Sequence, residues 1–220
     1  MPEYPAGGGQ KLRESEVKIA AREMGLPVLQ PEKLRDPEFL TALRALQPDL
    51  GIVIAFRMLP EAVWALPRLG TFNLHASLLP QYRGAAPINW ALINGETCTG
   101  VTTFLLNHEI YKGAILAQRT EPIRPDDNAG TLYERLMRIG AELVTQTVER
   151  IAAGDLQPVE QSPAGEETLC PAPKIFRENC EIDWSETGER IVNLVRGLAP
   201  YPAAWTTIRL DGEEIATIRS

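Results

Sequence analysis

The chain has 220 residues, of which 44% are hydrophobic and 23% are charged, as is usual for a folded globular protein. This composition excludes disorder, collagen and coiled coil as the main organisation of the chain. Lys and Arg number 22 against 29 Asp and Glu, and the resulting net charge of −7 argues against a protein that coats nucleic acid through its overall charge.

Three cysteines, Cys98, Cys170 and Cys180, are odd in number and never spaced as CxxC. They indicate neither a disulfide framework nor a zinc site, and a reducing compartment fits them best. No apolar stretch approaches the roughly 20 residues that cross a bilayer, and the first residues do not resemble a secretion signal. We therefore expect a cytoplasmic protein without a metal ion and without a membrane partner, and a monomer.

The N-terminal part predicts a loop, two helices and a strand. Residues 5–11 are glycine-rich and predict a loop, and apolar side chains at helical spacing predict a helix over 15–24. Asp36 before a proline is the start signature of a second helix. The apolar run at 50–56 is typical of a strand covered on both faces, and helix followed by buried strand favours a parallel sheet with crossovers.

The middle of the chain continues the alternation of strands and helices. Three strands and one short helix are expected, at 70–75, 100–106, 114–120 and 87–94. The longest helix follows, because Thr131 and Glu134 have the spacing of a capping box and apolar residues at helical spacing continue to Gly154.

A change of composition divides the chain after this helix. Residues 156–173 are rich in Pro, Gly, Glu and Ser, which marks a linker. We expect one domain over 1–155 and the start of another over 174–220. The elements expected in this C-terminal segment are a strand at 180–184, a helix at 185–196 ended by Gly197, and a strand at 205–210.

One of only two histidines, His75, follows Asn73 by two residues on the strand expected at 70–75. Side chains alternate along a strand, so both project from one face at the strand's end, where open α/β sheets place their ligands. An amide donor beside an imidazole can stabilise the oxyanion that forms when an amine attacks a carbonyl group. The alternative is that both residues only bind backbone groups at a strand end.

The residues around this pair form several longer motifs in order along the chain. They read PAGGGQKL at 5–12, NLHASLLP at 73–80, YRGAAPIN at 82–89, GVTT at 100–103, LCPAPKI at 169–175 and RGLAPYPAAW at 196–205. Together they resemble the folate-dependent formyltransferases, and within that family the enzymes that act on methionyl-tRNA. The resemblance runs from residue 5 to the last residues.

The resemblance implies a Rossmann-like α/β domain with an incomplete, mostly parallel sheet and the start of a C-terminal, OB-like β-barrel. It also implies a reaction in which the amine of initiator methionyl-tRNA attacks the formyl carbon of 10-formyltetrahydrofolate, with Asn73 and His75 steadying the oxyanion. The residues implied for the folate site are Ser77, Leu78, Leu79 and Pro80, where backbone donors beside leucines suit a flat heterocycle with a polar edge. Those implied for the tRNA are Lys11, Arg13 and Arg83, although a solvated surface explains Lys11 and Arg13 equally well.

The chain departs from the family at the third catalytic position. Where these enzymes carry Asp-x-Gly, this sequence reads Tyr111-Lys112-Gly113. A carboxylate there orients the imidazole and relays a proton, which a phenol with a pKa near 10 does poorly at neutral pH. We therefore expect weak activity or none, with Glu109 a poor surrogate because it lies two residues earlier.

Two further departures concern phosphate binding and the chain ends. Gly8 stands where the family usually has arginine, which removes a bidentate phosphate contact. Relatives begin with additional strands, so the sequence resembles a chain truncated at both ends, and we expect poor stability from unpaired backbone groups. Two other interpretations stay open: a folate- or tRNA-binding protein without turnover, and a formyltransferase acting on a sugar nucleotide or a purine precursor.

Overall fold

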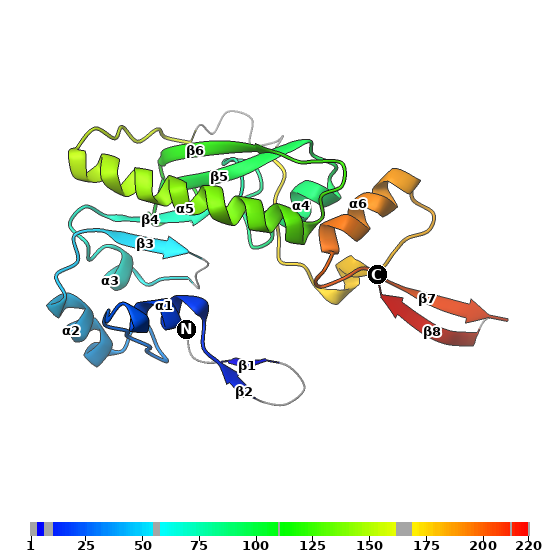
Figure 1. Cartoon of the computed structure of the whole chain (residues 1–220), viewed down its shortest axis with the longest axis horizontal. Coiled ribbons are helices and arrows are strands. Elements are labelled where there is room, and N and C mark those ends of the chain that lie inside the picture. Colours follow the sequence, from blue (N-terminus) through cyan, green and yellow to red (C-terminus); the bar gives the residue numbers. More distant parts are fainter. Residues whose placement is uncertain are drawn as a thin grey trace. The chain divides into compact units, whose positions relative to one another are not determined.

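The computed structural model describes residues 4–6, 11–54, 58–109, 111–161, 169–211 and 213–219, with the backbone alone described at 4–6, 11–13, 209–210 and 213–215. The chain divides into two compact units (Figure 1). The N-terminal unit consists of residues 1–51 and 56–70, and the main unit consists of residues 52–55 and 71–220.

A short antiparallel pair of strands and three helices are described in the N-terminal unit. Its elements are β1 (Tyr4–Ala6), β2 (Lys11–Arg13), α1 (Glu16–Glu23), α2 (Pro37–Ala45) and α3 (Glu61–Trp64). Ser15 and Asp36 cap α1 and α2 by accepting hydrogen bonds from backbone N–H groups of the first turn, so the two expected helices are confirmed. The antiparallel β1–β2 pair replaces part of the loop expected at 5–11, and Gly8 lies outside the described residues.

A four-stranded sheet organises the main unit. Its strands, in the order in which they lie side by side, are β3 (Gly51–Ile54), β4 (Thr71–His75), β5 (Cys98–Leu105) and β6 (Ile115–Pro122). The four strands expected from the sequence are therefore present, and together with the helices they confirm the α/β class. Strand β4 lies between β3 and β5, which buries the segment that carries the candidate catalytic pair.

The strand directions differ from those expected for part of the sheet. Asn73 of β4 lies opposite Phe104 of β5 and Thr102 of β5 lies opposite Gln118 of β6, and both pairs of strands are antiparallel. The parallel order that the helix–strand alternation predicts does not extend to these two pairs. The loop at 106–114 that joins β5 to β6 is too short for a crossover, so these neighbours must run antiparallel.

Strand β3 is less covered than its apolar sequence predicts. Ile52 and Ile54 are 45% and 62% exposed and alternate with less exposed residues. β3 is the last strand of the described sheet order. The continuous apolar run therefore marks a strand at the edge of the described sheet and not one buried on both faces.

Two helices cover the main unit's core. They are α4 (Pro87–Ile93) and α5 (Ala129–Ala153). Figure 1 shows α5 lying along the sheet, and its side chains Leu132, Leu136 and Leu143 belong to the same buried cluster as Val101 of β5. Gly154 ends α5 in the left-handed conformation as expected.

The capping box of α5 differs from the expected one. Thr131 and Glu134 do not form it; instead the side chain of Asn128 accepts a hydrogen bond from the Thr131 N–H, and the Thr131 hydroxyl accepts one from the Asn128 N–H. Asn128 is itself a strong cap residue, and it moves the start of the helix to Ala129.

The C-terminal segment adds four elements. They are the 3₁₀ helix η2 (Arg177–Cys180), α6 (Gly188–Leu198), β7 (Trp205–Leu210) and β8 (Glu213–Arg219). The strand expected at 180–184 is wrong, because η2 reaches Cys180 and only Glu181 forms an isolated bridge, to Trp205. Within 174–219, the described strands form one antiparallel pair, β7–β8, so the β-barrel stays a prediction.

Gly197 lies inside α6, where the sequence predicts the end of the helix. A Cβ atom at this position would lie 2.6 Å from Cγ1 of Ile93 in α4. The absence of a side chain lets α6 approach α4 closely, and Asn89 donates a hydrogen bond of 2.8 Å to the Gly197 carbonyl. The glycine therefore serves helix packing and not helix termination.

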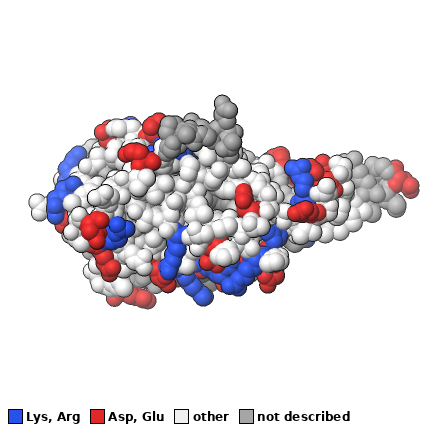
Figure 2. Space-filling model, turned by 90° about the horizontal axis from the view of Figure 1, so that it is seen from above, with Lys and Arg blue, Asp and Glu red and all other residues white. Residues whose placement is uncertain are grey.

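None of the helices in the described ranges is long and apolar enough to cross a membrane. Among the same residues, no cluster of three or more His, Cys, Asp or Glu could hold a metal ion. Figure 2 shows Lys and Arg side chains interspersed with Asp and Glu side chains on the face that it draws. Charge on that face is therefore mixed at short range.

Candidate active site

Asn73 and His75 are both buried on β4, with 2% and 6% of their surface exposed. Their spacing places them on one face of the strand. The Asn73 Nδ2 donates a hydrogen bond of 2.7 Å to the Val53 carbonyl of β3, and the His75 Nε2 donates one of 2.9 Å to the Tyr82 carbonyl. Both side chains thus bind backbone oxygens, as the structural alternative predicts, and each retains a further polar atom.

The hydrogen bond to Tyr82 determines which nitrogen of His75 carries the hydrogen. A carbonyl oxygen only accepts, so the hydrogen lies on Nε2 and the lone pair lies on Nδ1. Burial lowers the pKa of His75 below its ordinary value, and the bond to the Tyr82 carbonyl partly opposes this effect. The imidazole is therefore neutral at pH 7, with Nδ1 able to accept a proton.

Tyr111 is brought next to His75. Their ring centroids lie 5.0 Å apart with an angle of 49° between the rings, and the centroid of the Phe104 ring of β5 lies 6.2 Å from that of Tyr111. Burial raises the pKa of the Tyr111 phenol above its ordinary value. The position at which the resemblance predicts a carboxylate thus presents a neutral aromatic ring to the imidazole.

The turn at residues 77–80, which the resemblance implies for folate binding, is hydrogen-bonded mainly to side chains of β5 and β6. The Thr102 hydroxyl donates to the Ser77 carbonyl (2.6 Å) and accepts from the Leu79 N–H (3.2 Å). The Gln118 amide donates to the Leu79 carbonyl (2.8 Å). Leu79 and Ser77 are buried, whereas Leu78 and Pro80 are partly exposed.

These bonds engage part of the turn's backbone. Of the backbone groups expected to face a heterocycle, the Leu79 N–H already has a partner within the protein, and so do the carbonyls of Ser77 and Leu79. What the turn leaves accessible is apolar surface at Leu78 and Pro80. Thr102 and Gln118 supply the fastening, and no local sequence signal marks Gln118 for this role.

A second loop, residues 82–86, is held by residues 170–172, which we call the strap. The Tyr82 N–H donates to the Cys170 carbonyl (2.7 Å), the Ala172 N–H donates to the Arg83 carbonyl (2.9 Å), and the Ala86 N–H donates to the Ala172 carbonyl (3.2 Å). The strap lies within the segment that composition identifies as a linker. It holds the residue whose carbonyl orients His75.

The three residues expected to contact tRNA fall in different parts of the chain. Lys11 and Arg13 lie on β2 of the N-terminal unit, where the structure describes the backbone alone. Arg83 lies in the main unit, and its Nη2 donates a hydrogen bond of 2.6 Å to the side chain of Gln161. The partly buried Arg83 side chain is therefore bonded within the protein, to Gln161.

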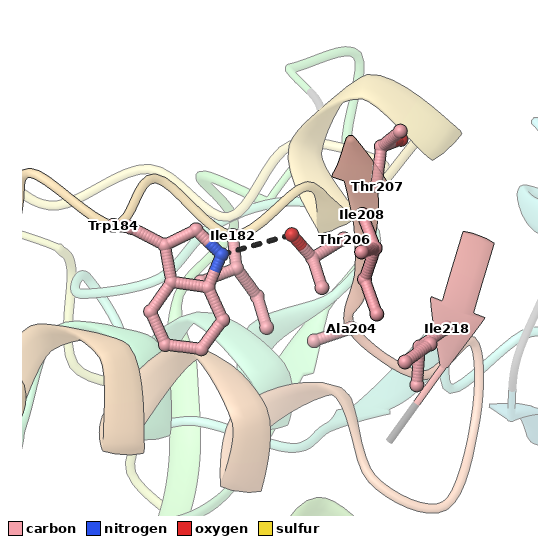
Figure 3. A pocket seen from close by; sticks show the side chains of 7 residues that line it. All are labelled: Ile182, Trp184, Ala204, Thr206, Thr207, Ile208 and Ile218. Atoms are coloured by element: carbon pink, nitrogen blue, oxygen red, sulfur yellow. Dashed lines mark hydrogen bonds between the residues drawn. The ribbon is translucent and has the colours of Figure 1, made fainter. Parts of the chain in front are cut away.

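A separate cavity lies in the C-terminal segment and has a volume of about 470 Å³ (Figure 3). Its lining residues are Ile182, Trp184, Ala204, Thr206, Thr207, Ile208 and Ile218. Figure 3 shows the Trp184 indole at one side of it, where Nε1 donates to the Thr206 hydroxyl (2.9 Å). Among the described lining residues there is no titratable side chain, so these residues offer no acid–base chemistry.

Two family models match the chain. A model described as formyl transferase matches residues 2–148, and one described as formyl transferase, C-terminal domain, matches residues 174–219. The chain is 58% identical over 220 residues to a protein from Parabacteroides distasonis named methionyl-tRNA formyltransferase, with 98% of this chain and 68% of that protein covered.

Solved structures show the same fold. HypX from Aquifex aeolicus in complex with tetrahydrofolic acid is 26% identical, with a TM-score of 0.66 over 81% of this chain and 30% of that chain. A Mycobacterium tuberculosis protein with a proposed sugar N-formyltransferase role is 25% identical, with a TM-score of 0.70 over 93% of this chain and 90% of that chain.

Proposed function

Because the chain belongs to the formyl transferase family, we propose that it transfers a formyl group from 10-formyltetrahydrofolate to the amino group of initiator methionyl-tRNA, with impaired activity. The observation that carries this proposal is the similarity along almost the whole chain to a relative named methionyl-tRNA formyltransferase. The complex of HypX with tetrahydrofolic acid supports the folate part. The folate supplies the formyl group, and the protein supplies binding, orientation and proton transfer.

His75 is proposed to accept the proton from the attacking amine and to pass it to the leaving group. Its Nε2 hydrogen is held by the Tyr82 carbonyl, so the neutral ring can accept at Nδ1 the proton that the attacking amine loses. The proton then passes from Nδ1 to the nitrogen that leaves with the folate, and the ring returns to its neutral state. A lowered pKa of His75 favours this release.

Asn73 is proposed to stabilise the charge that develops on the formyl oxygen. One hydrogen of its Nδ2 is donated to the Val53 carbonyl. A carboxamide nitrogen carries two hydrogens, so the second hydrogen of Nδ2 can be donated to the formyl oxygen. A donor fixed in this way costs no reorganisation when charge develops, which is the property that this kind of catalysis requires.

Tyr111 is the reason for the impaired activity. At pH 7 its half-buried phenol keeps its hydrogen because its pKa is raised, so it cannot take up a proton or stabilise a charged imidazole as a carboxylate would. Glu109 is not positioned to replace it, since its carboxylate is exposed and lies 3.8 Å from the Lys112 ammonium group.

The turn at 77–80 fits one part of the folate. The partly exposed Leu78 and Pro80 offer an apolar surface against which a flat ring can pack. The hydrogen-bonding groups of Ser77 and Leu79 that Thr102 and Gln118 engage serve to hold this surface in place. We propose that the turn contributes packing, with the polar edge of the ring bound by other groups.

The tRNA is the proposed macromolecular partner, with Lys11, Arg13 and Arg83 as contact residues. The proposed organisation is a catalytic domain over 1–155, a connecting segment over 156–173 and a tRNA-binding domain that begins at 174, with the start of an OB-like barrel. Matches of the two family models to 2–148 and 174–219 support these boundaries. A cytoplasmic monomer is proposed, and the three free cysteines support a reducing compartment.

The test is a formylation assay with charged initiator tRNA and 10-formyltetrahydrofolate that compares the chain with Tyr111→Asp. We expect the substitution to raise the rate by about 10²–10⁴-fold, because it supplies a positioned carboxylate. Tyr133→Asp on the exposed face of α5 is the matched control and should change nothing. His75→Asn added to Tyr111→Asp should abolish the gain. Absence of formylation by a folded Tyr111→Asp protein would contradict the proposed function.

A second candidate function is binding without turnover, which the contact of the Tyr111 ring with His75 favours. Fluorescence titration of the unmodified chain with tetrahydrofolate distinguishes it from an inactive chain. Binding together with no formylation, in both the unmodified chain and Tyr111→Asp, would favour this second function.

A further inference from the structure

Gln161 joins the two loops on either side of His75. Its side-chain Nε2 donates hydrogen bonds of 2.8 Å to the carbonyl oxygens of Tyr111 and Gly113. Its side-chain oxygen accepts a hydrogen bond of 2.6 Å from Arg83. One half-buried amide therefore connects the turn at 111–113 with the loop at 82–86.

Each of these loops contributes a group that touches the imidazole. The loop at 82–86 provides the Tyr82 carbonyl at 2.9 Å from Nε2, and the turn at 111–113 provides the Tyr111 ring at 5.0 Å. The distance between the two loops consequently determines how the Tyr82 carbonyl and the Tyr111 ring are placed around the His75 imidazole. Tyr111 also has a positive φ of 62°, a conformation that a bulky residue adopts only when its surroundings impose it.

The backbone around Gln161 is itself fixed. Val159 exchanges two hydrogen bonds of 2.8 Å with Ile115 at the start of β6. At Gly113, a Cβ atom would lie 1.7 Å from the Leu105 carbonyl oxygen, so this part of the turn is pressed against β5. The Gln161 amide therefore reaches its three partners from a position two residues beyond an anchored bridge residue.

We propose that Gln161 is a positioning residue of the active site, which holds the 111–113 turn and the 82–86 loop at a fixed distance around His75. This inference rests on the proposed function and deepens it, because it gives a role in the reaction to a segment that composition marks as a linker. Gln161 acts through its contacts with the loops and does not touch a reacting atom.

The direct test is the NMR spectrum of the imidazole groups in the unmodified chain, in Gln161→Ala and in Gln161→Glu. His75 and His108 are the two histidines of the sequence, so the spectrum holds two sets of signals, which His108→Gln assigns. The ring of Tyr111 shifts the resonances of His75 through its ring current. In both Gln161 variants we expect the His75 resonances to move toward those of an imidazole without an aromatic neighbour.

Gln161→Glu keeps the side-chain length and the acceptor for Arg83, and replaces the donor to the two carbonyls by a charged carboxylate oxygen. Gln157→Ala is the matched control, because Gln157 is an exposed residue of the same segment and should leave the His75 resonances in place. Unchanged His75 resonances in both folded Gln161 variants would overturn the proposal. Loss of the native fold in Gln161→Glu would also overturn it, since the role would then be a general one in stability.

An activity measurement separates this proposal from the proposed function. In the Tyr111→Asp background, Gln161→Glu should lower kcat by about 10²-fold, the effect of a misplacement of about 1 Å, with a smaller change in KM. Moved His75 resonances together with no formylation in any variant would support the positioning role and contradict the proposed function. Full activity of Gln161→Glu in this background would contradict the positioning role alone.

Discussion

Tyr111 shows how much a single residue can determine in this site. Its backbone has a positive φ of 62°, which aspartate and asparagine adopt more readily than a bulky aromatic residue. If the carboxylate that the resemblance implies at this position is restored, both the chemistry next to His75 and the strain of the turn should change. Restoring aspartate is expected to suit the backbone as well as the reaction.

His75 makes stability depend on pH. Its pKa in the folded protein is lowered by burial, so the unfolded chain binds a proton at higher pH than the folded chain does. The free energy of unfolding should therefore be constant above about pH 6.5 for this group, and should fall as the pH drops through the folded-state pKa. The slope is at most about 1.4 kcal/mol per pH unit.

Urea denaturation between pH 5 and 8, about the range in which histidine titrates, measures this dependence. His75→Gln keeps a donor for the Tyr82 carbonyl and removes the titration, so its stability should vary less with pH. His108→Gln removes the exposed histidine and should leave the dependence as it is in the unmodified chain. An equal pH dependence in His75→Gln and the unmodified chain would show that another group is responsible.

At the scale of elements, helix and strand positions follow largely from local sequence. Apolar runs predicted β4, β5 and β6, apolar residues at helical spacing predicted α1, and the cap residue Asp36 predicted α2, because these signals act over a few residues. Features set by partners far along the chain could not be predicted in this way. The antiparallel register of β4 with β5 and the place of Gly197 inside α6 both depend on a neighbour that the local pattern does not identify.

The start of α5 depends on Asp127. Its buried carboxylate accepts two hydrogen bonds of 2.6 Å from Arg135 and others from the Arg124 N–H and the Thr131 hydroxyl. The pairing with Arg135 is the main cause that holds the pKa of Asp127 well below its ordinary value. Its stabilising effect is therefore present above about pH 3.9 and is lost as the pH falls toward the folded-state pKa.

We expect Asp127→Asn to lower the free energy of unfolding by about 1–3 kcal/mol at pH 7, because a hydrogen-bonded charge is lost at a buried site. The loss should shrink at pH 3, where part of the effect is already gone from the unmodified chain. Chemical denaturation at both pH values provides the measurement, and Asp126→Asn at the exposed neighbouring position is the control. Equal losses for the two variants would contradict the role assigned to Asp127.

At the scale of the whole chain, amino-acid composition was least informative about the contacts made by the segment at 156–173. Its Pro, Gly, Glu and Ser content predicts a connection, and the described parts of it bind both loops around His75 through Gln161 and the strap. These are backbone and amide hydrogen bonds between residues far apart in sequence. They leave no periodic pattern, and a lone glutamine in a polar stretch carries no signal.

A substitution at Gly84 tests the close contact between the 82–86 loop and the strap. A Cβ atom at this residue would lie 2.0 Å from the Ala172 carbonyl oxygen, and the backbone has a φ of +142°. Gly84→Ala must displace the strap or the loop, and we expect it to be more destabilising than Gly154→Ala by about 1–3 kcal/mol. Gly154 also has a positive φ, of +69°, with nothing within 4 Å of its Cβ position, so it shows the effect of an added Cβ at a positive φ without a close contact. Thermal unfolding of both variants measures the difference, and equal effects would contradict close contact at Gly84.

The strap also sets an order of events during synthesis on the ribosome. The histidine and the loop that orients it are translated first, and the Cys170 carbonyl that receives the Tyr82 N–H arrives only when the polypeptide has grown far beyond the sheet. A shortened version that stops at residue 155 would contain every proposed catalytic side chain and still lack this bond. The strap, which follows the proposed catalytic residues in sequence, thus completes the proposed catalytic centre. Expression of residues 1–155 alone should therefore yield a His75 imidazole whose tautomer is no longer fixed.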